Sequence, residues 1–107
     1  MAHELPPLVQ RTITRLICAF APDQIILFGS YAKGTAHDRS DVDLLIVADL
    51  PGNPAVHNRR ARQLACDCFP RVDVVFASRE EVIAAETAKS PFLASILGSA
   101  AVIYRRT

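Results

Sequence analysis

Apolar side chains recur at three- and four-residue steps near the start of the chain. This spacing predicts an amphipathic helix whose outer face carries Gln10, Arg11 and Arg15. Pro6 and Pro7 suit its first turn, because a proline there leaves no intrahelical hydrogen bond unmade. The predicted inner stripe comprises Leu5, Leu8, Val9, Thr12, Ile13, Leu16, Ile17 and Phe20.

Short apolar runs follow this helix and predict strands. The run QIILF (24–28) comes after a break at Pro22 and Asp23, and its nearly continuous apolar character is typical of a strand covered on both faces. The runs VDLLIV (42–47) and VDVVF (72–76) have the same character. AVIYR (101–105) is interpreted as a last strand.

Helical patterns lie between these strands. The segment AVHNRRARQLACDCF (55–69) follows the turn DLPGNP and stops at Pro70. Its inner side is expected to hold Val56, Leu64, Ala65 and Cys68.

Two further helices are predicted towards the end of the chain. Ser78 is typical of an N-cap, with Glu80 and Glu81 near the positive end of the helix dipole, and this helix is expected to run towards Lys89. A short helix is expected to end near Gly98. Its apolar residues, which we interpret as core or interface, are Phe92, Leu93, Ile96 and Leu97.

Strands that alternate with helices indicate an α/β domain of two or three layers, with a largely parallel or mixed sheet. The chain has 107 residues and half of them are hydrophobic, so residues 1–107 are expected to form a single domain. The formal charge is +1, which disfavours a general nucleic-acid binder. The first residues do not resemble a signal peptide, and a cytoplasmic location is expected.

The three cysteines, Cys18, Cys66 and Cys68, cannot all pair within one chain. Their spacing falls short of a structural zinc site, so we interpret them as reduced thiols. His3, His37 and His57 are interpreted as exposed side chains rather than metal ligands.

Two carboxylates stand at the start of the second predicted strand. Because side chains alternate along a strand, Asp41 and Asp43 share one face. Asp73 has the same position in the third strand and would join them if the two strands are neighbours. Such a cluster of hard oxygen ligands favours magnesium, or manganese. Taken singly, Asp41 would also suit a strand cap and Asp73 a solvated strand end.

A phosphate-binding turn is expected just before these carboxylates. Gly29 ends the first predicted strand and Ser30 begins a short helix, so backbone N–H groups and the serine hydroxyl could meet a phosphate. The competing interpretation is a Walker A loop, since GSYAKGT contains Gly-x4-Gly. It fails because Thr35 stands where that motif needs lysine and Lys33 precedes the second glycine.

The stretch GSYAKGTAHDRSDVDLLIV, from Gly29 to Val47, resembles the signature of the polymerase-beta-like nucleotidyltransferases. The short chain is similar to their minimal (MNT-type) members. The resemblance implies an α/β (α+β) fold with a small mixed sheet flanked by helices. It also implies transfer of a nucleoside monophosphate from a nucleoside triphosphate such as ATP to an acceptor hydroxyl, with Mg²⁺ (or Mn²⁺) as cofactor.

The same resemblance implies roles for individual residues. Asp41 and Asp43 would bind the metals, and Asp73 would bind the catalytic metal and help to deprotonate the acceptor. The resemblance further assigns the triphosphate to four residues: Gly29 and Ser30 would hold the β- and γ-phosphates, while Lys33 and Ser40 would assist with phosphate charge and loop geometry.

Minimal members of this family often act as antitoxins of HEPN-type toxins, which are RNases, in some cases by adding AMP to a toxin tyrosine. The stretch after Asp73 is too short for the helical acceptor domain of larger relatives, so a partner is expected to supply the acceptor. Tyr31 stands where many relatives have arginine. Two alternatives stay open: a catalytically idle module that inhibits its partner by occlusion, and a transferase acting on a small molecule.

Overall fold

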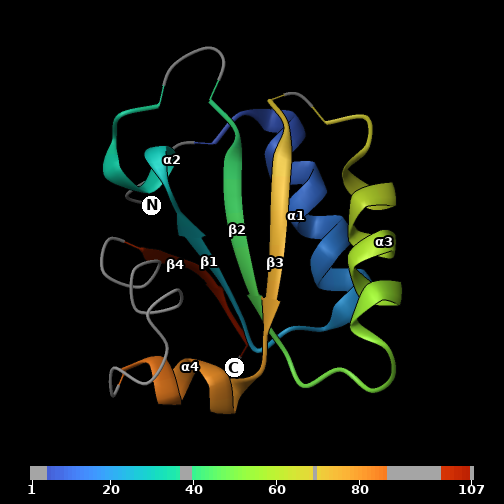
Figure 1. Ribbon diagram of the computed structural model, residues 1–107. Coiled ribbons are helices and arrows are strands. Elements are labelled where there is room, and N and C mark those ends of the chain that lie inside the picture. Colours follow the sequence, from blue (N-terminus) through green and yellow to red (C-terminus); the bar gives the residue numbers. More distant parts are fainter. Residues whose placement is uncertain (1–4, 37–39, 69, 87–99, 107) are drawn as a thin grey trace.

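The computed structural model describes residues 5–36, 40–68, 70–86 and 100–106. Its helices and strands follow one another as the sequence pattern predicts (Figure 1). In chain order they are α1 (Pro7–Phe20), β1 (Gln24–Phe28), α2 (Ser30–Lys33), β2 (Val42–Val47), α3 (Pro54–Ala65), β3 (Val72–Ala77), α4 (Arg79–Glu86) and β4 (Ala101–Arg105).

The described strands form one mixed sheet in the order β3-β2-β1-β4. Strand β1 runs antiparallel to both β2 and β4, whereas β2 and β3 are parallel. The starts of β2 and β3 and the end of β1 therefore meet at one end of the sheet, where Figure 1 also shows α2. Helix α4 lies at the opposite end. The predicted mixed α/β architecture is confirmed.

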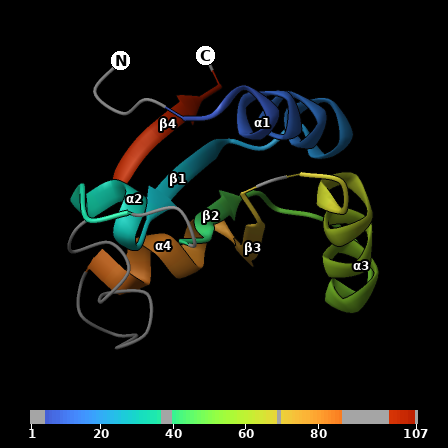
Figure 2. The same ribbon diagram turned by 90° about the horizontal axis from the view of Figure 1, so that it is seen from above.

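Helices cover the sheet on both faces (Figure 2). Helices α1 and α3 pack on one face, where Leu16 and Ala61 meet Leu44 in the larger core cluster. Helix α4 packs on the other face, where Val82 meets Leu45. This arrangement explains the unbroken apolar runs of β1 and β2, since alternate residues of each strand enter different clusters.

The inner stripe of α1 is narrower than the sequence pattern predicts. Val9, Thr12, Leu16 and Phe20 are buried, but Leu8 is 43% exposed. Leu8 lies one residue, about 100° of rotation, from Val9, so it turns away from the core.

Arg15 also departs from the prediction, because it is not simply an outward residue of α1. Its guanidinium Nη1 lies 3.2 Å from Oδ1 of Asp67 and donates to the backbone oxygen of Leu64 at 3.4 Å. Arg15 therefore links α1 to the end of α3.

In α3 the predicted inner face is partly wrong. Ala61 and Ala65 are buried, whereas Val56 is 54% exposed. The inward row is His57, Ala61 and Ala65, spaced four residues apart, and Val56 lies about 100° away from it. The small alanines let α3 approach β3 closely, and Phe76 of β3 packs edge-on against Phe20 of α1, with ring centroids 5.1 Å apart.

The start of α4 has the predicted cap. The backbone N–H of Glu81 donates to the Ser78 hydroxyl, and the N–H of Ser78 donates to Oε1 of Glu81, each at 3.1 Å. This reciprocal pair is a capping box. The rest of that predicted helix beyond residue 86, and the short helix with its apolar residues at 92, 93, 96 and 97, lie outside the described residues.

The three cysteines carry no disulfide: Cys18 and Cys66 are exposed thiols and Cys68 is half-buried. No helix in the described ranges is long and apolar enough to cross a membrane.

Candidate active site

The parallel register of β2 and β3 brings two of the predicted carboxylates together. Asp43 lies directly opposite Asp73, and on its other side Asp43 lies opposite Phe28, the last residue of β1. Residues aligned in a parallel ladder project from the same face, so both carboxylates stand on the face that α4 covers further along. Asp41 precedes Asp43 by two positions and is half-buried. Asp73 therefore lies beside Asp43, because β2 and β3 are neighbours in the sheet.

Asp43 is the electrostatic centre of this group. Partial burial raises the pKa of its carboxyl group above the ordinary value, and the negative charges of Asp73 and Asp41 raise it further. The carboxylates of Asp73 and Asp41 thus disfavour the ionised form of Asp43. A cation bound among the three would favour that ionised form.

Gly29 leaves room for the Asp43 side chain. It has φ +75° and ψ −154°, a conformation that essentially only glycine adopts without strain. A Cβ at this position would overlap Oδ2 of Asp43 and stand 3.2 Å from its Cγ. The turn therefore needs glycine twice: once for its backbone conformation and once for the close approach of the carboxylate.

The residues that follow Gly29 form a short turn at the end of the sheet where Asp43 and Asp73 lie. The backbone oxygen of Ser30 accepts from the N–H of Thr35 at 2.9 Å, which closes α2, and Ser30 is half-buried. Lys33 is exposed, and Ser40 is half-buried directly before Asp41. Tyr31 packs against the larger core cluster instead of standing at the surface of the turn.

A divalent cation fits the chemistry of this group. Its donors are carboxylates on one face, and the missing side chain of Gly29 makes room for the carboxylate of Asp43. Within the part of the chain that the structure describes, no three acidic, histidine or cysteine side chains are close enough to form a preassembled metal site. Asp41, Asp43 and Asp73 would have to draw closer to share an ion.

Arg71 is a neighbour of the site that the sequence reasoning missed. Its Nε lies 3.5 Å from Oδ1 of Asp73, in an exposed ion pair at the start of β3. The alternation of side chains places residues 71 and 73 on the same side of an extended chain, and this was the available signal.

His57 and the segment 58–62 belong to α3, on the other face of the sheet from the carboxylates. His57 shares a 2.7 Å hydrogen bond with the backbone oxygen of Pro51 on the α3 side of the sheet. His3 and His37 lie outside the described residues. In the segment NRRAR (58–62) the polar side chains are exposed while Ala61 is buried, and the guanidinium of Arg60 stands over the Phe20 ring, 5.4 Å from its centroid.

A comparison with known protein families identifies the family to which the chain belongs. Residues 11–97 match the family described as the nucleotidyltransferase domain. The chain belongs to this family. The matched range of this nucleotidyltransferase domain contains all three carboxylates and the Gly29 turn.

Individual relatives agree with the family. A stretch of 51 residues is 43% identical to MJ1305 of Methanocaldococcus jannaschii, a protein provisionally named a protein adenylyltransferase. The stretch is 47% of this nucleotidyltransferase domain and 35% of that relative, so the match spans about a third of the relative's length.

Two crystal structures share the fold. One is a toxin–antitoxin with AMP-PNP, with a TM-score of 0.62, 24% identity and coverage of 92% of this chain and 74% of that one. The other, from Sulfolobus solfataricus, is provisionally named a nucleotidyltransferase, with a TM-score of 0.62, 18% identity and coverage of 92% and 78%. At these identities the likeness establishes the fold of the nucleotidyltransferase domain.

Proposed function

We propose that this protein transfers AMP from ATP to a hydroxyl group of a partner protein. The observation that carries the proposal is the direct pairing of Asp43 with Asp73, beside a glycine whose missing side chain accommodates Asp43. Membership of the nucleotidyltransferase domain family supports the reaction class. Two relatives support the substrates: one is named a protein adenylyltransferase, and another was solved with an ATP analogue.

In this proposal the three carboxylates act together at the start of β2 and β3. Asp41 and Asp43 would hold divalent cations, and Asp73 would help to hold the catalytic one. When bound, such cations neutralise the triphosphate and lower the pKa of the attacking hydroxyl. The acceptor oxygen forms a bond to the α-phosphorus, the bond from that phosphorus to the bridging oxygen breaks, and pyrophosphate leaves. Asp73 takes the proton of the acceptor hydroxyl.

The turn before β2 would bind the triphosphate tail. Gly29 lets the backbone approach the β- and γ-phosphates closely, and the Ser30 hydroxyl would donate a hydrogen bond to them. Lys33 is exposed at the end of α2, and its ammonium group would assist with the charge of the phosphates. Ser40 would shape the loop that enters β2.

The partner we propose is an HEPN-type RNase toxin encoded by a neighbouring gene, with a tyrosine as the acceptor. The resemblance to minimal nucleotidyltransferases implies such a partner, and a structural relative is a toxin–antitoxin. The protein would then act as the antitoxin, because AMP on the toxin blocks its activity.

The test is the intact mass of the partner. The product of the adjacent gene, incubated with this protein, ATP and magnesium, is expected to gain one or more AMP units. An unchanged mass with every nucleotide tried, including GTP, CTP and UTP, would refute the proposal. So would an unchanged yield from Asp43→Asn.

The same assay distinguishes the idle-module alternative. If the Asp41→Asn, Asp43→Asn double variant still neutralises the partner fully at equal concentration, the protein inhibits by occlusion and the transfer proposal fails. We expect the double variant to bind the partner but to leave it active.

A further inference from the structure

A second pocket lies at the end of the sheet opposite the candidate active site. It has a volume of about 500 Å³ and lies between the start of β1, the ends of β2 and β4, and α4. Three arginines line it: Arg79 from α4, and Arg105 and Arg106 from the end of β4. Only one acidic side chain, Asp23, is among its described lining residues.

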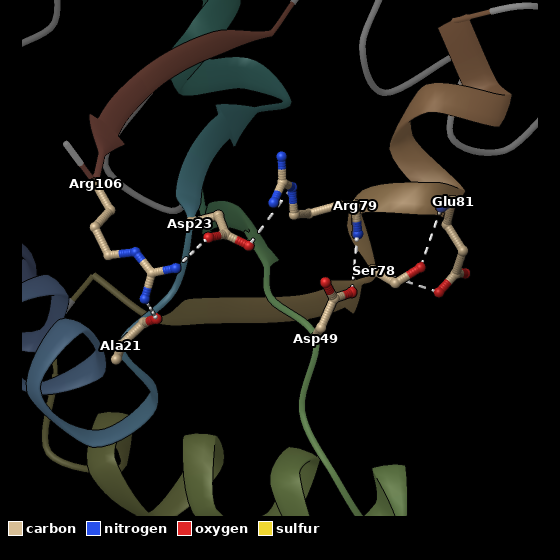
Figure 3. Close-up of polar contacts among 7 residues, drawn as sticks. All are labelled: Ala21, Asp23, Asp49, Ser78, Arg79, Glu81 and Arg106. Atoms are coloured by element: carbon tan, nitrogen blue, oxygen red, sulfur yellow. Dashed lines mark hydrogen bonds and ion pairs between the residues drawn. The ribbon is translucent and has the colours of Figure 1, made fainter.

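Asp23 is held between two of these arginines (Figure 3). Nη2 of Arg106 lies 2.7 Å from Oδ1 of Asp23, and Nε of Arg79 lies 4.0 Å from Oδ2. The backbone of Asp23 is fixed as well, since its N–H donates to Val47 and its oxygen accepts from the N–H of Arg106, both at 2.8 Å. The carboxylate therefore pairs closely with Arg106 and only loosely with Arg79, and its single charge does not neutralise both guanidinium groups.

Hydrogen bonds within the protein hold the backbone of Arg79 at the edge of the pocket. Its backbone N–H donates to Oδ1 of Asp49 at 3.3 Å, and the neighbouring capping box of Ser78 and Glu81 fixes the start of α4 (Figure 3). Its side chain is still 65% exposed. Arg105 is exposed and forms no ion pair with any described residue. The pocket therefore offers positive charge that the described residues leave uncompensated.

An apolar surface lies beside these charges. Ile83 of α4 lines the pocket and is 60% exposed, next to the buried side chains of Val47 and Val82. A ligand that matches this pocket needs carboxylates for the arginines and an apolar side chain for Ile83.

We propose that this pocket, which we term the arginine pocket, docks an acidic segment of a partner protein that carries glutamates or aspartates beside an apolar residue. The apolar surface beside the arginines favours a protein segment over nucleic acid. The exposed side chain of Ile83 matches an apolar residue and has no counterpart in a phosphate backbone, no aromatic side chain among the described lining residues can stack on a base, and the formal charge of the chain is only +1. A partner held here would leave the carboxylate end of the sheet uncovered (Figure 1).

The test uses a fluorescein-labelled peptide of alternating glutamate and leucine, and measures its fluorescence anisotropy with the wild-type protein in the absence of metal and nucleotide. We expect saturable binding that weakens as salt is raised. The Arg79→Gln, Arg105→Gln double variant should bind about tenfold more weakly, the scale expected for the loss of two exposed ion pairs in a shared pocket. A peptide with glutamine in place of glutamate should not bind.

Matched controls separate the pocket from general charge. Arg11→Gln with Arg59→Gln removes the same charge from exposed positions of α1 and α3, and should leave peptide binding unchanged. If the pocket double variant melts at a lower temperature, Arg105→Gln alone, which loses no ion pair with a described residue, should still weaken binding.

Several results would overturn the proposal. They are an absence of saturable binding, equal binding of the glutamine peptide, and an equal loss in the control pair. An oligouridylate that competes for the pocket and binds more tightly than the peptide would assign it to RNA. A concentration-dependent dimer that is abolished by Arg105→Gln would assign it to a second copy. Since the assay contains neither metal nor nucleotide, its outcome is independent of nucleotidyl transfer.

Discussion

At the scale of single residues, Asp43 and Gly29 define the candidate site together. The carboxylate of Asp43 is partly buried among like charges and occupies space that any side chain at position 29 would fill. The burial among like charges is unfavourable in the protein alone, and a bound cation would compensate for it. Sites that are strained or electrostatically unfavourable before ligand binding are typical of functional residues.

Replacing Gly29 by alanine should be more destabilising than replacing another glycine of positive φ. Gly29→Ala is expected to lower the free energy of unfolding by about 2 to 3 kcal/mol, because the new Cβ meets Asp43 in a backbone conformation that disfavours side chains. Gly34→Ala is the matched control, since Gly34 also has φ +75° but nothing lies within 4 Å of its Cβ position. We expect its cost to be about 1 kcal/mol, as measured by chemical denaturation. Equal losses in the two variants would contradict the close approach of Asp43.

Neutralising Asp43 should stabilise the metal-free protein. A carboxyl group whose pKa is raised in the folded state holds its proton more tightly there, so wild-type stability falls as pH rises from the unfolded-state pKa through the raised one. Asp43→Asn removes this loss. We expect its melting temperature to exceed that of wild type at pH 7 and the difference to shrink below pH 4 or so.

Asp67→Asn is the control for this effect, because it removes an exposed carboxylate that has an attractive partner in Arg15. It should not raise the melting temperature. A lower melting temperature for Asp43→Asn at neutral pH would show that the carboxylate is stabilised, not repelled, by its surroundings.

At the scale of elements, the apolar runs predicted the strands well because a buried strand leaves little freedom of composition. The predicted bounds of β1, β2 and β4 agree with the structure, and β3 extends one residue further, to Ala77. Helix faces were harder to predict. The fully buried residues of α3 are two alanines, which contrast weakly with a polar helix. Leu64 and Cys68 pack against the core as predicted, but Val56 is exposed.

The positions of the candidate residues on their strands could be predicted from the sequence. The pairing of strands that brings Asp43 and Asp73 together could not. Alternation along one strand puts Asp41 and Asp43 on one face, which the sequence alone determines. That Asp73 joins them depends on β3 pairing with β2 in parallel and in this register, a long-range choice that no local pattern encodes. The ion pair of Arg71 with Asp73 is different, because residues two apart project from the same side of an extended chain and this pair could have been predicted.

The capping box makes its own prediction about α4. Ser78→Ala removes the hydroxyl that accepts from the N–H of Glu81, and should cost about 1 kcal/mol in the free energy of unfolding. Thr14→Ala is the control, since the Thr14 hydroxyl only donates to an oxygen within its own helix at an exposed position, and should cost little. Urea denaturation of both variants measures the difference. An unchanged stability for Ser78→Ala would mean that the cap contributes nothing in solution.

At the scale of the whole molecule, charge is divided between the two ends of the sheet. Carboxylates gather where β2 and β3 begin, and arginines gather where β2 and β4 end, around α4. The net charge of +1 does not by itself indicate this separation. We propose that one end carries out the chemistry and that the other holds a partner protein.

The most direct test of nucleotidyl transfer follows the α-phosphate of ATP. The partner protein and magnesium are incubated with this protein and ATP labelled at either the α- or the γ-phosphate, and label bound covalently to the partner is measured. The account predicts incorporation from α-labelled ATP only, with the γ-label released as pyrophosphate, and no incorporation with the Asp41→Asn, Asp43→Asn variant. Incorporation from γ-labelled ATP, none from α-labelled ATP, or an undiminished signal from the variant would contradict it.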